Sequence, residues 1–193
     1  MIRPDGLDQQ QGKFENKPKV TITAGGHKCE IINADELTSK NGKVYIKLQF
    51  DFAEGDSQAG ALKENFKQVG KWQSNGYAMV WVHDYNNPKE SSRDFKSLVT
   101  SLQNSNGFTI DWGVDADFCK QIVGKKIGIV FQDKEQEYNG RKFWRAEKYY
   151  FCDFEEAPKR PTPQAKPLNN NSSNMNNMQS VPVENIPTGN IPF

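Results

Sequence analysis

The chain has 193 residues, a net charge of +1, and no apolar run near the roughly twenty residues that a membrane helix needs. Because no strongly basic domain is present, any binding to nucleic acid would need a local patch or stacking instead of an overall positive field. Three widely spaced cysteines without a C-x-x-C pair indicate reduced thiols and argue against a structural zinc site. We therefore expect a soluble, cytoplasmic protein without a cofactor.

Composition divides the chain into three parts. Residues 1–18 lack the apolar segment of a secretory signal and are predicted to be a disordered lead-in. Residues 158–193 are rich in Asn, Pro, Ser and Gln and poor in aliphatic groups, which predicts a disordered tail. The segment between them, 19–157, is long enough for one domain with its own core. The tail carries a net charge of +2, which leaves −1 for the rest of the chain.

The first half of the domain shows the period of two that is typical of strands. A strand is predicted over His27–Leu37, and the Asn-Gly pair within Ser39–Gly42 predicts a tight hairpin turn with positive φ at both central residues. The next strand runs over Val44–Phe50, where the even-numbered residues are apolar. Residues 53–72 fit an inserted hairpin, a loop or a short helix. A third strand is predicted over Gly76–His83.

The period then changes to that of a helix. Ser91 and Ser92 are both suitable N-caps, and the apolar residues that follow recur at helical spacing until Asn106-Gly107. This pattern predicts a helix of about thirteen residues. A short turn of helix is expected around Asp115–Ile122, with Asp115 as its N-cap and Gly124 closing it.

Two further strands, Lys126–Phe131 and Lys142–Phe151, complete the domain, and residues 132–141 between them contain a second Asn-Gly pair. Strand, strand, strand, helix, strand, strand is the element order of the OB-fold, a partly open Greek-key barrel that binds oligonucleotides on its second and third strands and two connecting loops. We therefore predict a mainly β, five-stranded OB-fold-like barrel with one helix between the third and fourth strands. A five-stranded sheet with a helix can also close in other ways.

The outward face of the second and third strands is the first candidate binding surface. If the even-numbered residues fill the barrel, the outward side chains are those of Tyr45, Lys47, Gln49, Tyr77, Met79 and Trp81. Aromatic rings of this kind stack on unpaired bases and contribute about 1–3 kcal/mol per base regardless of sequence. The alternative is that these rings pack beneath residues 53–72.

The last hairpin is the strongest local charge feature. Basic side chains alternate there with aromatic rings and are opposed only by Glu147; they are Arg141, Lys142, Arg145 and Lys148. Basic groups between aromatic rings suit a groove that follows a phosphate backbone and stacks bases.

Alternation along this hairpin places Trp144, Ala146 and Tyr150 on one side, with Trp144 and Ala146 in the core, and leaves Arg145 and Tyr149 outside. The loop cations that would flank an OB-type groove are Lys40, Lys43, Lys134 and Arg141. The alternative for each of these lysines is that it only keeps a hairpin soluble.

Catalytic constellations are sparse. Asp111, Asp115 and Asp117 are the only close set of carboxylates that could hold the divalent ions of a nuclease. The two histidines, His27 and His83, lie near no cysteine or serine motif, so nucleophilic triads have no support. The chain contains no phosphate-binding loop and no dinucleotide fingerprint. We therefore expect no enzymatic activity.

The chain ends in Ile191, Pro192 and Phe193, an aromatic ring beside a free carboxylate, which suits docking into a partner's pocket. A single OB-like domain, a Pro/Asn/Gln-rich linker and this tip resemble the bacterial and phage single-stranded DNA-binding proteins. The segments KNGKVYIKLQFDF and YNGRKFW are more similar to divergent phage-encoded relatives. The resemblance implies that the domain coats exposed single strands, in the host cytoplasm if the protein is phage-encoded. It also implies that the tip recruits replication, recombination or repair enzymes.

The chain departs from that family just before the tip. The family has an acidic run there, whereas this chain has residues 185–190 without a charge and Glu184 as the nearest acid. A pocket that reads the acidic run would bind this tail more weakly. The sequence Asn-Ile-Pro occurs twice, at residues 185–187 and 190–192, so a partner would have two copies of the same contact available.

The leading hypothesis from the sequence is a non-enzymatic, sequence-tolerant single-stranded DNA-binding protein with a protein-recruiting tip. The alternative is an OB-like adaptor that binds replication proteins and not nucleic acid, which the near-neutral domain favours. No membrane partner is expected, and the sequence leaves open whether the protein is a monomer or a homo-oligomer.

Overall fold

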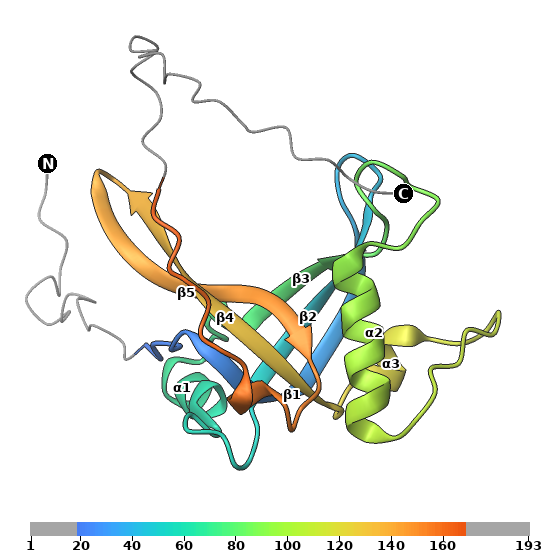
Figure 1. Cartoon of the computed structure of the whole chain (residues 1–193), viewed down its shortest axis with the longest axis horizontal. Coiled ribbons are helices and arrows are strands. Elements are labelled where there is room, and N and C mark those ends of the chain that lie inside the picture. The colour runs from blue at the N-terminus through green and yellow to red at the C-terminus, as the bar shows by residue number, and fades with distance from the viewer. Residues whose placement is uncertain (1–18, 169–193) are drawn as a thin grey trace, which may run out of the picture.

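The computed structural model describes residues 19–168 (Figure 1). The elements, in chain order, are β1 (Gly25–Thr38), β2 (Val44–Phe52), α1 (Ala61–Val69), η1 (Ser74–Gly76), β3 (Tyr77–Trp81), α2 (Arg93–Asn106), α3 (Phe118–Ile122), β4 (Lys126–Tyr138), β5 (Arg141–Cys152) and η2 (Ala157–Lys159). The predicted lead-in and the predicted partner-binding tip, Ile191–Phe193, lie outside the described residues. No helix in the described part is long and apolar enough to cross a bilayer.

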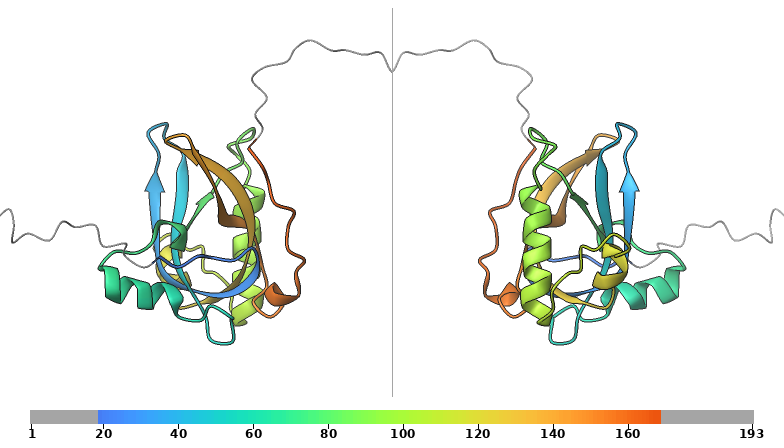
Figure 2. Two further views of the ribbon diagram at one scale, coloured as in Figure 1. Left: turned by 90° about the vertical axis from the view of Figure 1, so that its left-hand side faces the viewer. Right: turned by 90° about the vertical axis from the view of Figure 1, so that its right-hand side faces the viewer.

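The strands form one antiparallel sheet in the order β3-β2-β1-β4-β5. This confirms the mainly β prediction with five strands. Within residues 19–168, β3 and β5 are the edge strands and do not pair with each other, so the sheet is not closed and the predicted barrel is not confirmed. Figures 1 and 2 show the tips of the β1–β2 and β4–β5 hairpins extending toward the same side, with α1 near the opposite end of the sheet.

The inward faces of the strands form the core as the alternation predicts. Ile46, Leu48 and Phe50 of β2 are at most 1% exposed, and Ala78 and Val80 of β3 are also buried. Fully burying a side chain such as Leu or Ile stabilises the fold by about 1.5–3 kcal/mol. The same alternation therefore fixes which side chains of β2 and β3 point away from the core.

Helix α2 confirms the helix prediction at both ends. The Ser92 side chain accepts a hydrogen bond from the Phe95 N–H, and Gly107 ends the helix with φ of 61°. Leu98 and Leu102 are fully buried, and the helix contacts β3, β4 and β5. Helix α2 thus helps to cover the core where the two edge strands fail to meet.

The other two helices differ from the prediction in position or capping. The unassigned segment 53–72 contains α1, so the described chain has three helices where the predicted architecture had one between the third and fourth strands. The expected helical turn forms α3, but its N-cap is Asp117, whose carboxylate accepts from the Lys120 N–H at 3.1 Å. The assignment of that cap to Asp115 is therefore wrong.

A buried carboxylate of β2 determines where α1 begins. Gly60 occupies the N-cap position with φ of 71° and has no side chain to cap the helix. Asp51, only 1% exposed, replaces it by accepting hydrogen bonds from the N–H groups of Phe52 (2.9 Å), Leu62 (3.0 Å) and Lys63 (3.2 Å). The positive end of the helix dipole further favours the charge there.

The β4–β5 hairpin is longer than predicted. Residues 132–141 do not form a connecting loop, because β4 continues to Tyr138 and β5 starts at Arg141. Only Asn139 and Gly140 remain in the turn, with φ of 51° and 74°. Both turn residues here have the positive φ that an Asn-Gly hairpin turn prefers. For the first hairpin, the prediction of positive φ at both central residues is wrong. Its three-residue turn has positive φ only at Gly42.

Residues 161–168 run along the outer half of β4, where β1 has diverged from it. The Glu135 N–H donates to the Lys166 carbonyl at 2.9 Å, and the Lys166 N–H donates to the Asp133 carbonyl at 2.8 Å. Gln132 adds a side-chain bond to the Gln164 carbonyl. This segment, hereafter the C-terminal strap, adds a short parallel bridge to the sheet.

Candidate functional site

The outward side chains of β2 and β3 form a ladder of rings and cations, here called the aromatic face. The register pairs Tyr45 with Trp81, Lys47 with Met79, and Gln49 with Tyr77. The Tyr45 and Trp81 rings lie 5.2 Å apart at 55°, and Lys47 Nζ lies 4.3 Å from the Tyr77 ring centroid. The four residues predicted to bind along this face are therefore in contact in pairs.

The aromatic face is not covered by the segment that could have hidden it. Residues 53–72 fold as a loop and α1 beyond the Phe52 end of β2, where Asp51 holds the helix. Trp81 is 41% exposed and Met79 is 53% exposed. The alternative in which these rings pack beneath residues 53–72 is therefore wrong for Trp81.

The end of the face nearest the β1–β2 turn carries a residue that the sequence reasoning missed. Lys43 Nζ lies 3.7 Å from the ring centroid of Tyr85, which is 82% exposed. Asp84 shapes this loop by accepting from the N–H groups of Asn86 and Asn87. An aromatic residue in a polar loop just after a strand that carries two outward rings was the signal available in the sequence.

The β4–β5 hairpin is less basic than its second strand alone suggested. Glu147 is not the only opposing acid, because β4 brings Asp133, Glu135 and Glu137 into register with β5. Lys134 Nζ pairs with Glu147 at 3.1 Å, and Lys148 pairs with Asp94 of α2. Those two lysines are therefore neutralised locally.

The three cations of this hairpin that were predicted to bind DNA and are not yet placed lie in no ion pair within the described part of the chain. Arg141 and Lys142 are exposed beside the turn, and Arg145 Nη2 lies 3.2 Å from Ser74 Oγ of η1. Lys40 and Lys43 lie on the other hairpin, whose tip extends toward the same side (Figure 1). The fold therefore places predicted cations on two separate hairpins and does not bring them into contact.

Two aromatic assignments on β5 need correction. Trp144 was expected in the core but is 52% exposed, because the hairpin extends past the core, whereas Ala146 is buried as predicted. A bulge leaves Tyr149 unpaired, so the alternation reverses and Tyr150 does not share a side with Ala146. Tyr149 is exposed, as predicted, but it packs against Tyr150 and faces the C-terminal strap, away from the aromatic face.

The acidic set proposed for a nuclease does not converge. Asp111 accepts from the Gly113 N–H at 2.8 Å, and Asp117 caps α3. Residues 19–168 hold no group of three or more side chains suited to a metal ion. The nearby Cys119 thiol has its pKa raised to about 11, first by burial and then by Asp117, so it stays protonated and is a poor nucleophile.

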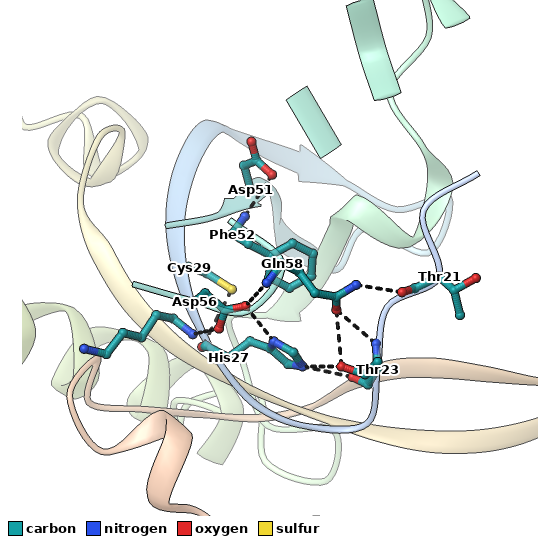
Figure 3. Close-up of polar contacts among 9 residues, drawn as sticks. Thr21, Thr23, His27, Cys29, Asp51, Phe52, Asp56 and Gln58 are labelled. Carbon is teal, nitrogen blue, oxygen red and sulfur yellow. Dashed lines mark hydrogen bonds and ion pairs between the residues drawn. The ribbon is translucent and has the colours of Figure 1, made fainter. Parts of the chain in front are cut away.

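A second polar cluster surrounds the buried His27 (Figure 3). His27 Nδ1 lies 3.0 Å from Asp56 Oδ1, and Nε2 lies 3.1 Å from both the hydroxyl and the carbonyl oxygen of Thr23. Gln58 accepts from the Thr23 N–H and donates to the Thr21 carbonyl at 2.8 Å. The sequence reasoning missed this arrangement, because it placed no hydroxyl near either histidine.

Thr23, His27 and Asp56 are connected in the same order as a catalytic triad, but their surroundings indicate a structural role. Nε2 faces the Thr23 carbonyl, which only accepts, so a ring nitrogen that donates there has no lone pair for the hydroxyl proton. The ring also packs at 5.1 Å from Phe52 and 5.6 Å from Phe131, which leaves no room for a substrate. We interpret the cluster as the contact that holds residues 21–23 against the loop after β2.

Hydrogen bonding also controls the ionisation of Asp56. Burial raises the pKa of this carboxyl group, but the bonds from His27 and from the N–H groups of Gln58 and Lys28 outweigh it and leave the pKa below its usual value. Asp56 is therefore ionised at neutral pH. It stabilises the contact between residues 21–23 and the loop after β2 most at pH values above the usual pKa of a carboxyl group.

No protein-family model and no curated protein sequence matches this chain. The candidate function therefore rests on the geometry of the residues described above.

Proposed function

We propose that the chain is a non-enzymatic, sequence-tolerant single-stranded DNA-binding protein that coats exposed strands during replication, recombination or repair. The observation that carries the proposal is the aromatic face, where partly exposed rings on adjacent strands lie beside lysines. Every base has a π-face, so such rings accept any sequence. The strand order and the place of α2 support an OB-fold-like architecture that is left open between β3 and β5.

Charge supports the same use of this face. Lys43 and Lys47 lie over Tyr85 and Tyr77, so each cation is held near a ring that can stack. A base on the ring would place its phosphate close to the ammonium group, where displacement of counterions favours binding. We propose that Lys40 on one hairpin, with Arg141, Lys142 and Arg145 on the other, contacts the strand on either side.

The test is a fluorescence titration with oligo-dT and with duplex DNA at two salt concentrations. We expect tight, salt-dependent binding to the single strand and weaker binding to the duplex. The double variant Tyr45→Ala/Trp81→Ala should lose affinity by about 30-fold or more, because two stacking rings are removed. The matched control is Trp112→Ala, which removes an exposed ring of the α2–α3 loop and should bind normally. Unchanged binding by the double variant would refute the proposal.

The tail function is a separate part of the proposal. Ile191, Pro192 and Phe193 would recruit replication, recombination or repair enzymes, with the ring in a pocket and the carboxylate on a basic residue. Removing these three residues should leave DNA affinity unchanged while abolishing partner capture. Equal loss of both activities would contradict this division.

The second candidate is an adaptor that binds replication proteins and not nucleic acid. The ion pairs that neutralise much of the β4–β5 hairpin favour it, because a protein interface needs no excess of positive charge. Partner capture that survives nuclease treatment, together with an absence of oligonucleotide binding, would select this candidate.

A further inference from the structure

A surface groove of about 820 Å³ lies between β5, the turn η1 and the N-terminal residues 19–24. Its β5 wall consists of residues 143–146. Asp133 of β4, the sheet partner of Ala146, also lines the groove, so the groove lies beside the β4–β5 hairpin where η1 and residues 19–24 approach it. The groove therefore separates β5 from the turn that leads into β3, the other edge strand of the sheet.

The lining of the groove has the chemistry of a base-binding site. Trp144 is 52% exposed and Phe143 is 42% exposed, so both rings are available to a ligand. Arg145 is positioned by its bond to Ser74 Oγ, and Lys19 adds a second cation against the single acid, Asp133. Planar rings beside a positioned guanidinium suit stacking on a nucleobase.

The groove is connected to the end of the aromatic face through η1, which lines the groove and directly precedes β3. Ser74, which holds Arg145, precedes Tyr77, the last ring of the aromatic face, by three residues. From Trp81 to Tyr77 the face extends about 13 Å at the usual rise of a strand. A strand lying on the face and continuing past Tyr77 would therefore reach Arg145 and Trp144 next.

We infer that this groove is a second base-binding station for the same single strand, with Trp144 as its stacking ring and Arg145 as its cation. The inference rests on the proposed function and assigns a role to a tryptophan that alternation had placed in the core. A short strand binds only to the aromatic face. A longer strand binds to the aromatic face and also occupies the groove.

The experiment compares oligo-dT of about 4 and about 16 nucleotides, the limits of the range that one OB fold covers. Trp144→Ala in the full-length chain should lower the affinity for the long oligonucleotide by about 5- to 150-fold, the effect of losing one stacked base. The affinity for the short oligonucleotide should not change. Trp144→Phe keeps a ring and should restore most of the affinity. Trp112→Ala is the control for loss of an exposed tryptophan, and thermal melts confirm that each variant is folded.

The outcomes separate this inference from the proposed function. If the unmodified protein binds neither oligonucleotide at low salt, the proposed function fails and the inference fails with it. If it binds both but Trp144→Ala has no effect, or has the same effect at both lengths, only the second station is overturned. A free strand edge can also accept a peptide strand, and that use of the groove predicts the no-effect outcome.

Discussion

The salt dependence of DNA binding should reveal whether one hairpin or both hold the strand. Six cations of the candidate site lie in no ion pair within the described residues; they are Lys40, Lys43, Lys47, Arg141, Lys142 and Arg145. For single strands the logarithm of the binding constant changes by about 0.7 per phosphate neutralised for each tenfold change in salt. If all six cations contact phosphates, the logarithm of the binding constant plotted against the logarithm of the salt concentration should have a slope of about −4. If only the three on β2 and its turn do so, the slope should be about −2.

The two modes differ enough to measure. Raising monovalent salt from about 50 to about 200 mM should weaken binding about 300-fold if both hairpins contact phosphates and about 20-fold if only the first does. The assay is fluorescence anisotropy of labelled oligo-dT over a series of salt concentrations. In the two-hairpin mode, Arg141→Gln/Lys142→Gln should make the slope shallower by about 1.4.

The control variant is Lys63→Gln/Lys67→Gln on α1, which removes two exposed cations far from the hairpin tips and should leave the slope unchanged. A slope near zero at measurable affinity would refute the assignment of all six cations. An equal change of slope in both double variants would mean that net charge, and not position, controls binding.

Three further predictions concern the scaffold of the site. Asp51→Ala leaves the buried N–H groups of Phe52 and Leu62 without this acceptor and should cost about 2 kcal/mol or more in urea unfolding, with a loss under 1 kcal/mol contradicting its capping role. Asp56 has a lowered pKa in the folded state, so the stability it contributes is present above about pH 4 and is lost as pH falls further. Asp56→Asn should therefore flatten the decline of stability as the pH falls below about 4, and an unchanged decline would exclude this carboxylate as its cause. Leu98→Ala, at a fully buried position of α2, should cost about 2–5 kcal/mol, whereas Thr100→Ala on the exposed side should cost little.

Local patterns were sufficient to predict two parts of the molecule. The faces of β2 follow from a strict period of two, because one side of the strand packs on the core and the other does not. The ends of α2 follow from Ser92 and Gly107, whose capping geometry depends only on neighbouring residues. The ring ladder of the aromatic face could be predicted for the same local reason.

The features that were missed depend on contacts between distant residues. Residues 132–137 are polar or charged on both sides of the strand, so no apolar period marks the outer half of β4. The position of Trp144 depends on how far the hairpin extends past the core, and the start of α1 depends on Asp51, eleven residues before Leu62. His27 and Asp56 are separated by 29 residues. Only the assembled fold brings these groups together.

The C-terminal strap has a consequence for any shortened form of the protein. By satisfying the backbone groups of Asp133 and Glu135, it shields a stretch of strand border that could otherwise recruit foreign chains into intermolecular sheets. Pro163 and Pro167 flank the bridge at Lys166 and lack the N–H groups needed to propagate such pairing outward. A chain cut after residue 157 would lack the strap and expose this strand border, which favours aggregation. A fragment that stays monomeric should therefore extend at least to Leu168.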